Sequence, residues 1–163
     1  MYQYPYYHDL CGAWWANFTP KIMAYLTTVV LNEFTLQSDC LDFMFGQIAG
    51  RLDDEKLQDF KEAVYSREDT ASTYIEDGLA VPHGRVAGLP EDMVVVGLSR
   101  RGIDWPEEDR KAHIVVLIGI DRSKVSAYLA LLQKIIKWRK SISVDFDNFN
   151  PAEIGESLKK YFQ

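Results

Sequence analysis

The chain has 163 residues, which is enough for one domain with a full hydrophobic core and too few for two ordinary domains. Hydrophobic residues make up 47% and charged residues 26%, as in soluble globular proteins, and no apolar run reaches the roughly 18 residues that would cross a bilayer. The formal net charge of -6 argues against broad nucleic-acid binding, which needs a basic face.

The first predicted segment is an aromatic-rich arm over residues 1–20, which contains Trp14 and Trp15. It has no basic stretch followed by an apolar run, so it is not a secretory signal. Disordered tails rarely carry so many aromatic residues, and we expect the arm to pack on the domain or on a neighbouring subunit. Residues 21–163 are expected to form one cytoplasmic domain.

The first part of that domain is predicted to contain one strand and two helices. Residues 26–31 are largely β-branched, which favours a strand. Ser38-Asp39 resembles an N-cap for a helix over about 40–49. Asp53-Asp54 begins a second helix, in which apolar residues recur at helical spacing up to Tyr65, and acidic residues at its start suit the helix dipole.

After the second helix, the spacing of apolar residues changes from the helical period to the period of strands. Short strands are predicted over 70–75 and 79–81, divided by the turn signal at 76–78. Longer apolar strands follow over 93–98 and 113–120, and the second is apolar on both faces, which is typical of a central strand.

Two helices are predicted after these strands. Ser123 can cap a helix over about 124–139, and Pro151 suits the first turn of a last helix that runs through Phe162. The order of elements predicts an α/β domain, a central mixed β-sheet with helices on both faces.

Cys11 and Cys40 match neither a metal-ligand spacing nor a disulfide framework, so we expect inert thiols in a reducing compartment. The sequence predicts no metal site, since no second histidine or cysteine lies close to His83, the histidine of greatest interest. We also expect no cofactor, because a Gly-rich nucleotide loop of the P-loop kind is absent from the sequence.

His83 has the sequence context of a functional histidine. Pro82 fixes the backbone ahead of it, and Gly84 permits close approach by a ligand or partner. At a strand end, one ring nitrogen can act as a nucleophile while a backbone carbonyl holds the other. By contrast, His8 in the arm has no evident partner, and His113 precedes a buried strand, where histidines are more often structural.

The segment from Arg67 to His83 resembles the signature of the mannitol/fructose-type (type 2) IIA proteins. These are phosphocarriers of the bacterial phosphoenolpyruvate-dependent sugar phosphotransferase system. In that family an Arg-Glu pair ends a helix, Ser-Thr begins a strand, and a Gly-x-Ala-x-Pro-His segment carries the phosphorylated histidine. The resemblance continues through residues 102–105 and 128–132 and covers roughly 25–162. It implies the mannitol/fructose-type IIA fold.

Carried over to this sequence, the resemblance implies that His83 is the phosphoryl acceptor and Arg67 the active-site arginine. A planar guanidinium can stabilise the phosphate and the transition state through two parallel hydrogen bonds. The alternative for Arg67 is an exposed cation near a helix C-terminus. The Gly84 amide is a supporting candidate. Three further residues occupy motif positions where turn-forming or strand-capping roles compete with catalysis: Ser72, Thr73 and Asp77.

The resemblance also implies partners. Family members take the phosphoryl group from the small carrier HPr and pass it to a IIB domain, which phosphorylates sugar as the membrane component IIC imports it. Membrane association would then be indirect, through IIC, and no nucleic acid is involved.

Departures from the family pattern keep other hypotheses open. Mannitol-type members often have a second histidine where Tyr128 stands, whereas tyrosine is familiar in fructose-type and nitrogen-regulatory relatives. The helix after Ser38 also lacks the usual Lys-Glu-Glu-Ala opening. A IIA-like regulator, in which phosphorylation of His83 controls a protein partner, is therefore the alternative. A hydrolase with His83 as general base is a third hypothesis, although no Gly-x-Ser-x-Gly elbow is present to supply its nucleophile.

Overall fold

The computed structural model describes residues 24–106 and 108–162, so the predicted arm over 1–20 and Cys11 lie outside the described residues. In chain order the elements are β1 (Ala24–Val30), α1 (Gln37–Gly46), the short 3-10 helix η1 (Ala49–Arg51), α2 (Asp54–Thr70), β2 (Tyr74–Glu76), β3 (Leu79–Ala80), β4 (His83–Val86), β5 (Asp92–Asp104), β6 (Lys111–Asp121), α3 (Val125–Ser141) and α4 (Pro151–Phe162).

The strands form one mixed sheet in the order β1-β5-β6-β3-β2, and β4 also pairs with β6. β5 and β6 are antiparallel, whereas β1 runs parallel to β5. On its other side β6 pairs in parallel first with β3 and then with β4. The prediction that the strand over 113–120 is central is confirmed, because β6 is paired on both sides and its residues from Ile114 to Ile120 are buried.

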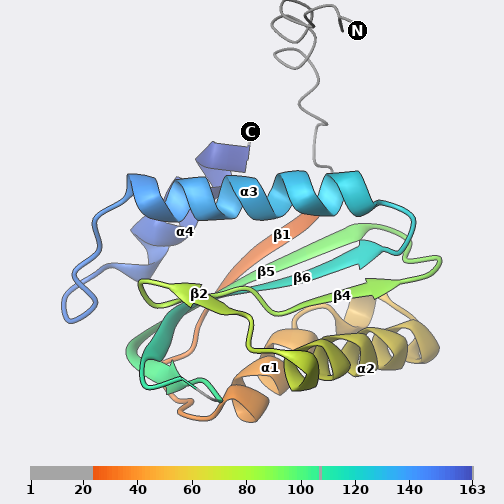
Figure 1. Cartoon of the computed structure of the whole chain (residues 1–163), viewed down its shortest axis with the longest axis horizontal. Coiled ribbons are helices and arrows are strands. Elements are labelled where there is room, and N and C mark those ends of the chain that lie inside the picture. The colour runs from red at the N-terminus through yellow and green to blue at the C-terminus, as the bar shows by residue number, and fades with distance from the viewer. Residues whose placement is uncertain (1–23, 107, 163) are drawn as a thin grey trace, which may run out of the picture.

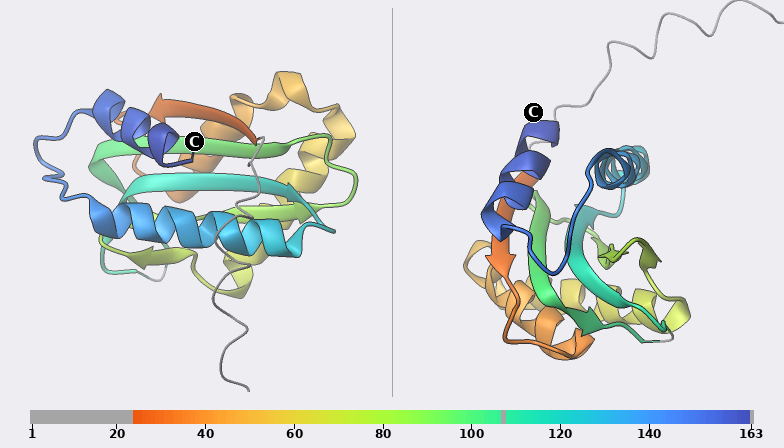
Figure 2. Two further views of the ribbon diagram at one scale, coloured as in Figure 1. Left: turned by 90° about the horizontal axis from the view of Figure 1, so that it is seen from above. Right: turned by 90° about the vertical axis from the view of Figure 1, so that its left-hand side faces the viewer.

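Helices cover both faces of the sheet, α3 and α4 on one and α1 and α2 on the other (Figure 1; Figure 2). The side chains of β5 alternate between the two layers. Val94 and Val96 belong to the core beneath α3 and α4, and Met93 and Val95 to the core beneath α1 and α2. The predicted α/β architecture, a central mixed sheet with helices on both faces, is confirmed.

Helix α2 begins as predicted and ends later than predicted. The Asp53 side chain accepts a hydrogen bond from the Lys56 amide at 2.7 Å, as an N-cap does. The helix continues past Tyr65 to Thr70, so the strand predicted over 70–75 starts only at Tyr74. The apolar pattern stops early because the last turns of α2 bury no residue completely, and periodicity reports burial rather than helicity.

Two predicted N-caps are wrong. Helix α1 starts at Gln37 rather than near Cys40, because Leu36 is held extended in a β-bridge to Asp104 and the chain turns into the helix directly after it. Ser123 does not cap α3; its hydroxyl and amide both donate to the Asp121 carboxylate. Pro151, by contrast, opens α4 as predicted.

The thiol of Cys40 is buried under α1, and burial raises its pKa to about 12. It is therefore protonated at neutral pH, which confirms the prediction of an inert thiol. Across 24–106 and 108–162, none of the helices has the length and apolar character to cross a membrane.

Candidate functional site

The site forms at β4, a short strand that pairs only with β6 among the described residues. Gly84 faces α2, where a Cβ would lie 3.0 Å from Phe60 Cδ2 and 3.1 Å from Ala63 Cβ. The space that the sequence assigned to a ligand is thus taken by the helix. Because side chains alternate along a strand, His83 and Arg85 face the opposite side, toward α3.

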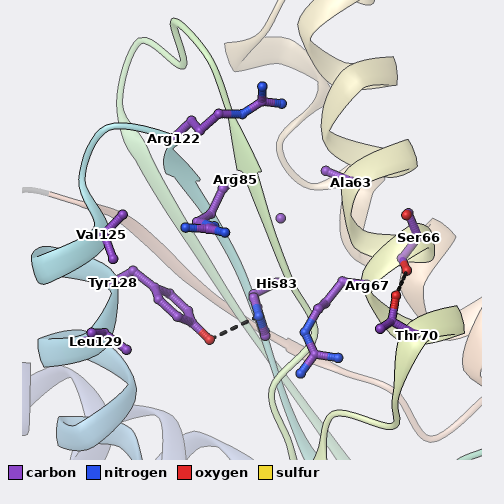
Figure 3. A pocket seen from close by; sticks show the side chains of 11 residues that line it. Ala63, Ser66, Arg67, Thr70, His83, Arg85, Arg122, Val125, Tyr128 and Leu129 are labelled. Carbon is purple, nitrogen blue, oxygen red and sulfur yellow. Dashed lines mark hydrogen bonds between the residues drawn. The ribbon is translucent and has the colours of Figure 1, made fainter.

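Both nitrogens of the His83 ring have defined neighbours. Nδ1 lies 2.9 Å from the carbonyl oxygen of Val81, and Nε2 lies 3.0 Å from the hydroxyl of Tyr128 on α3 (Figure 3). A carbonyl oxygen can only accept, so the ring proton belongs on Nδ1 and the lone pair on Nε2. The Tyr128 hydroxyl then donates to Nε2. Nε2, which faces Tyr128, is therefore in the unprotonated form that a nucleophile requires.

The surroundings keep this imidazole neutral. Burial lowers the pKa of His83 below the ordinary value of 6.5, and the cations of Arg67 and Arg85 lower it further, while the Val81 carbonyl opposes the shift. Burial also raises the pKa of Tyr128, against the influence of the same two arginines. At neutral pH the ring carries no charge and the phenol keeps its proton.

His83 opens into a pocket of about 560 Å³ between α2, β4 and the start of α3 (Figure 3). Three arginines line the pocket, Arg67, Arg85 and Arg122, and no carboxylate is among its lining residues in the described chain. In a protein with a net charge of -6, this is a local concentration of positive charge. Such a pocket favours an anion.

Arg67 reaches the pocket from the last turn of α2, on the other side of β4 from Tyr128. The end position of β4 permits this, because no further strand separates α2 from α3 at this edge among the described residues. The Nη1 of Arg67 donates to the carbonyl oxygen of Ala71 at 2.7 Å, which orients the guanidinium. The remaining donors of this side chain are available to a ligand.

The residue after Arg67 anchors the end of the helix. Glu68 accepts hydrogen bonds from the hydroxyl of Thr73 and, at 3.3 Å, from the amide of the same residue. The side chains of Gln37 and Trp105 donate to the same carboxylate at 3.1 and 3.3 Å. Glu68 thereby fixes the backbone that carries Arg67.

The other sequence candidates lie outside the lining of the pocket. The Ser72 hydroxyl accepts a hydrogen bond from the Tyr74 amide at 3.2 Å, and Thr73 is buried against Glu68. Asp77 has a φ of 51° in the turn between β2 and β3, and its carbonyl accepts two hydrogen bonds from Arg139. The structure therefore brings His83, Gly84 and Arg67 together, and gives Ser72, Thr73 and Asp77 the contacts of strand starts and turns.

Sequence reasoning assigned no role to Arg85, Arg122 or the Tyr128 hydroxyl. One signal was available, since residues 83 and 85 lie two apart in a strand and must share a face. The positions of Tyr128 and Arg122 depend on how α3 and the turn before it pack over β4, which no local pattern contains.

The family described as "Phosphoenolpyruvate-dependent sugar phosphotransferase system, EIIA 2" matches residues 27–144. The chain is 33% identical over 121 residues to the PTS system fructose-specific EIIABC component of Bacillus subtilis (strain 168), a match that covers 71% of this chain and 19% of that protein. It is 30% identical over 112 residues to the PTS system 2-O-alpha-mannosyl-D-glycerate-specific EIIABC component of Escherichia coli (strain K12), over 61% of this chain and 17% of that protein. The chain thus spans less than a fifth of the length of these relatives.

Solved structures share the fold. Nitrogen regulatory protein IIA-Ntr from Neisseria meningitidis superposes with a TM-score of 0.65 at 17% identity, over 82% of this chain and 92% of that one. IIA mannitol from Escherichia coli gives a TM-score of 0.62, also at 17% identity, over 82% and 95%. The enzyme IIAMTL in its complex with phosphorylated enzyme IIBMTL, also from Escherichia coli, gives 0.58 at 19% identity, over 80% and 94%.

Proposed function

Because this chain belongs to the EIIA 2 family of the phosphoenolpyruvate-dependent sugar phosphotransferase system, we propose that it receives a phosphoryl group on His83 from phospho-HPr and passes it to a IIB domain. The observation that carries the proposal is the state of His83. Its Nε2 lone pair faces a pocket that is lined by three arginines and by no carboxylate of the described chain.

The proposed transfer needs no net proton movement at His83. The Nε2 lone pair forms a bond to phosphorus while the N–P bond of the donor phosphohistidine breaks and returns its electron pair to the donor ring. The proton stays on Nδ1, which continues to donate its hydrogen bond to the Val81 carbonyl oxygen. Transfer to IIB reverses these roles, with Nε2 as the leaving group. A site for such a reaction mainly needs positioning and fixed positive charge.

Arg67 and Tyr128 have distinct proposed roles. Arg67 binds equatorial phosphoryl oxygens through the donors that Ala71 leaves free. In the resting protein the Tyr128 hydroxyl is hydrogen-bonded to Nε2, and this hydrogen bond must break as the N–P bond forms. The hydroxyl then donates its hydrogen bond to a phosphoryl oxygen, so the site never leaves this half-buried donor without an acceptor.

The setting of the reaction follows from the relatives. Tyr128, in place of a second histidine, and the 33% identity to a fructose-specific component both favour a fructose-type over a mannitol-type system. The fold similarity to enzyme IIAMTL, whose structure was solved in complex with phosphorylated enzyme IIBMTL, supports a IIB partner. We expect a cytoplasmic protein that meets the membrane only through a IIC component.

A regulatory role is the second candidate, favoured by the fold similarity to nitrogen regulatory protein IIA-Ntr. A regulator accepts the phosphoryl group on His83 in the same way. It differs in the next step, because its phosphorylation state changes the binding of a protein partner and no IIB domain receives the group.

The test is a reconstitution with phosphoenolpyruvate, the first enzyme of the system and HPr. We expect one phosphoryl group per chain, lost on acid treatment, and located at His83 by mass spectrometry. His83→Ala abolishes the label, and His113→Gln serves as the matched histidine control that keeps it. Unchanged labelling of His83→Ala contradicts the proposal.

A second stage separates transport from regulation. The phosphorylated protein is mixed with the IIB domains encoded in the same genome, and label on each is followed. Transfer to a IIB domain supports the sugar-transport role. A stable phosphoprotein that transfers to none of them supports the regulatory alternative.

A further inference from the structure

Arg85 lies close to His83, and neither the motif nor the proposed function gives it a role of its own. It follows His83 by two residues in β4 and lines the same pocket, on the face of the strand away from α2. Its side chain is exposed, and no hydrogen bond or ion pair to another described residue engages its guanidinium. An arginine with all its donors uncommitted at a pocket mouth is available for an anion.

Four of the other arginines donate to protein acceptors within the described residues, and three, like Arg85, do not. Arg139 donates to the carbonyl oxygens of Asp77 and Ile142, and Arg51 pairs with Glu91 at 2.7 Å. Even Arg67 gives one donor to Ala71. Arg85 is distinguished by its place, because it lies beside His83 in a pocket whose lining supplies no carboxylate in the described chain.

The positions of Arg67 and Arg85 complement each other. Figure 3 shows their guanidinium groups on different sides of the His83 ring, Arg67 from α2 and Arg85 from β4 on the side of Tyr128. Both cations also lower the pKa of His83 and that of Tyr128, so each lies within electrostatic range of the reacting nitrogen and of the phenol. Arg122 points toward the far end of the pocket in the same view.

A transferring phosphoryl group spreads its charge over three equatorial oxygens, and one guanidinium fork binds at most two of them. We propose that Arg85 is a second phosphoryl-binding residue, which holds the phosphoryl group on His83 from the side opposite Arg67. This inference rests on the proposed function, which supplies phospho-HPr as the biological phosphoryl donor. The binding role of Arg85 itself requires only that a phosphoryl group is attached to Nε2 of His83.

The experiment uses potassium phosphoramidate, a small donor that phosphorylates imidazole without a protein partner. The N–P bond of phosphoramidate breaks, ammonia leaves, and the new N–P bond forms at Nε2 of His83. The rate of this reaction is followed by ³¹P NMR for the wild-type protein and for Arg85→Gln, Arg85→Lys and the control Arg101→Gln. The pKa of His83 is titrated by NMR in each variant.

We expect Arg85→Gln to slow phosphorylation about tenfold and to raise the pKa of His83, since one nearby cation is lost. Arg85→Lys restores the lowered pKa and recovers the rate only in part, because an ammonium supplies charge without the fork. Arg101→Gln removes the charge of an exposed arginine of β5 that lies outside the pocket lining, and it changes neither quantity measurably. We expect both Arg85 variants to keep the wild-type unfolding temperature, because the side chain is exposed and has no protein partner among the described residues. A lowered unfolding temperature would instead indicate a structural role for Arg85.

Two results overturn the inference. One is an Arg85→Gln variant that is phosphorylated as fast as the wild type. The other is an equal loss in Arg101→Gln, which would indicate an effect of total charge rather than a binding residue. Failure of phospho-HPr to label a wild-type protein that phosphoramidate does label counts against the proposed function alone. The two proposals can therefore fail separately.

Discussion

His83 and His113 belong to the same sheet and are anchored in the same way, yet the regions around them have opposite characters. The Nδ1 of each ring lies 2.9 Å from a backbone carbonyl oxygen, that of Val81 for His83 and that of Ser99 for His113. The ring of His113 stacks on Phe146, with centroids 4.2 Å apart and planes 12° from parallel. His83 instead faces a pocket.

Two glycines pack closely around His113 and the Phe146 ring that stacks on it. Gly102 has a φ of 74°, and a Cβ there would lie 3.0 Å from the His113 Nε2. A Cβ on Gly78 would lie 2.9 Å from Phe146, which covers the ring. The second nitrogen of His113 lies beside the backbone of Gly102, whereas that of His83 faces Tyr128 and the arginines. The comparison teaches that anchoring one nitrogen is common to both roles, and that the surroundings of the other nitrogen distinguish them.

The largest expected effect comes from the arginine side of the pocket. The guanidinium of Arg67 beside His83 has no counterpart in the contacts of His113 with the described residues. We expect Arg67→Lys to lower the rate of phosphoryl transfer from phospho-HPr about 100-fold, because a lysine ammonium cannot bind two oxygens in parallel. Rapid-quench kinetics measure this loss. Arg101→Lys, an exposed arginine of β5, is the control and keeps the wild-type rate; a loss below about threefold in Arg67→Lys would contradict the assigned role.

For the stability of the fold, we expect substitution of His113 to have a larger effect than substitution of His83. His113→Ala lowers the free energy of unfolding by about 2 kcal/mol, since the stack on Phe146 is lost and the carbonyl of the buried Ser99 loses its donor. His83→Ala costs less than about 1 kcal/mol, because water in the open pocket can replace the ring at Val81. Urea unfolding of both variants measures the difference, and equal losses would remove the distinction between the two regions.

A smaller effect is expected at Tyr128. Tyr128→Phe keeps the aromatic ring, whose centroid lies 4.8 Å from that of His83, and removes only the hydroxyl. If the hydroxyl passes from Nε2 to a phosphoryl oxygen, its loss lowers the equilibrium yield of phosphoprotein about fivefold. Phosphoprotein yield against donor concentration tests this prediction, and a raised yield would indicate that the hydroxyl only blocks the nitrogen.

The smallest expected effect is a shift in pH dependence. Phosphoryl acceptance needs the unprotonated Nε2, and the pKa of His83 lies below the ordinary 6.5 because of burial and the two cations. The acceptance rate therefore stays on its plateau as the pH falls through 6.5, and declines only at lower pH. A profile with phosphoramidate over the acid range measures the midpoint. A midpoint at or above 6.5 would show that the pocket does not hold the ring neutral.

Local chemistry in the sequence was sufficient for part of the fold. Asp53 and Pro151 mark helix starts because capping and proline geometry act within one turn. The central position of β6 follows from burial of both its faces, which the continuous apolar run records. The end of α2 and the start of α1 were not predicted correctly. Contacts such as the Leu36 bridge to Asp104 join residues far apart in the chain, and no local pattern contains them.

The same division applies to the candidate site. The residue types could be read from the sequence, since the motif from Arg67 to His83 contains the proposed nucleophile and its arginine, and the alternation of a strand places Arg85 on the face of His83. That these side chains meet depends on tertiary packing. Packing of α2 against Gly84 and of α3 over β4 brings Arg67 and Tyr128 to one imidazole from two sides of the sheet edge. The physical reason is that helix-on-sheet packing is set by the shape of the whole core, which no local segment encodes.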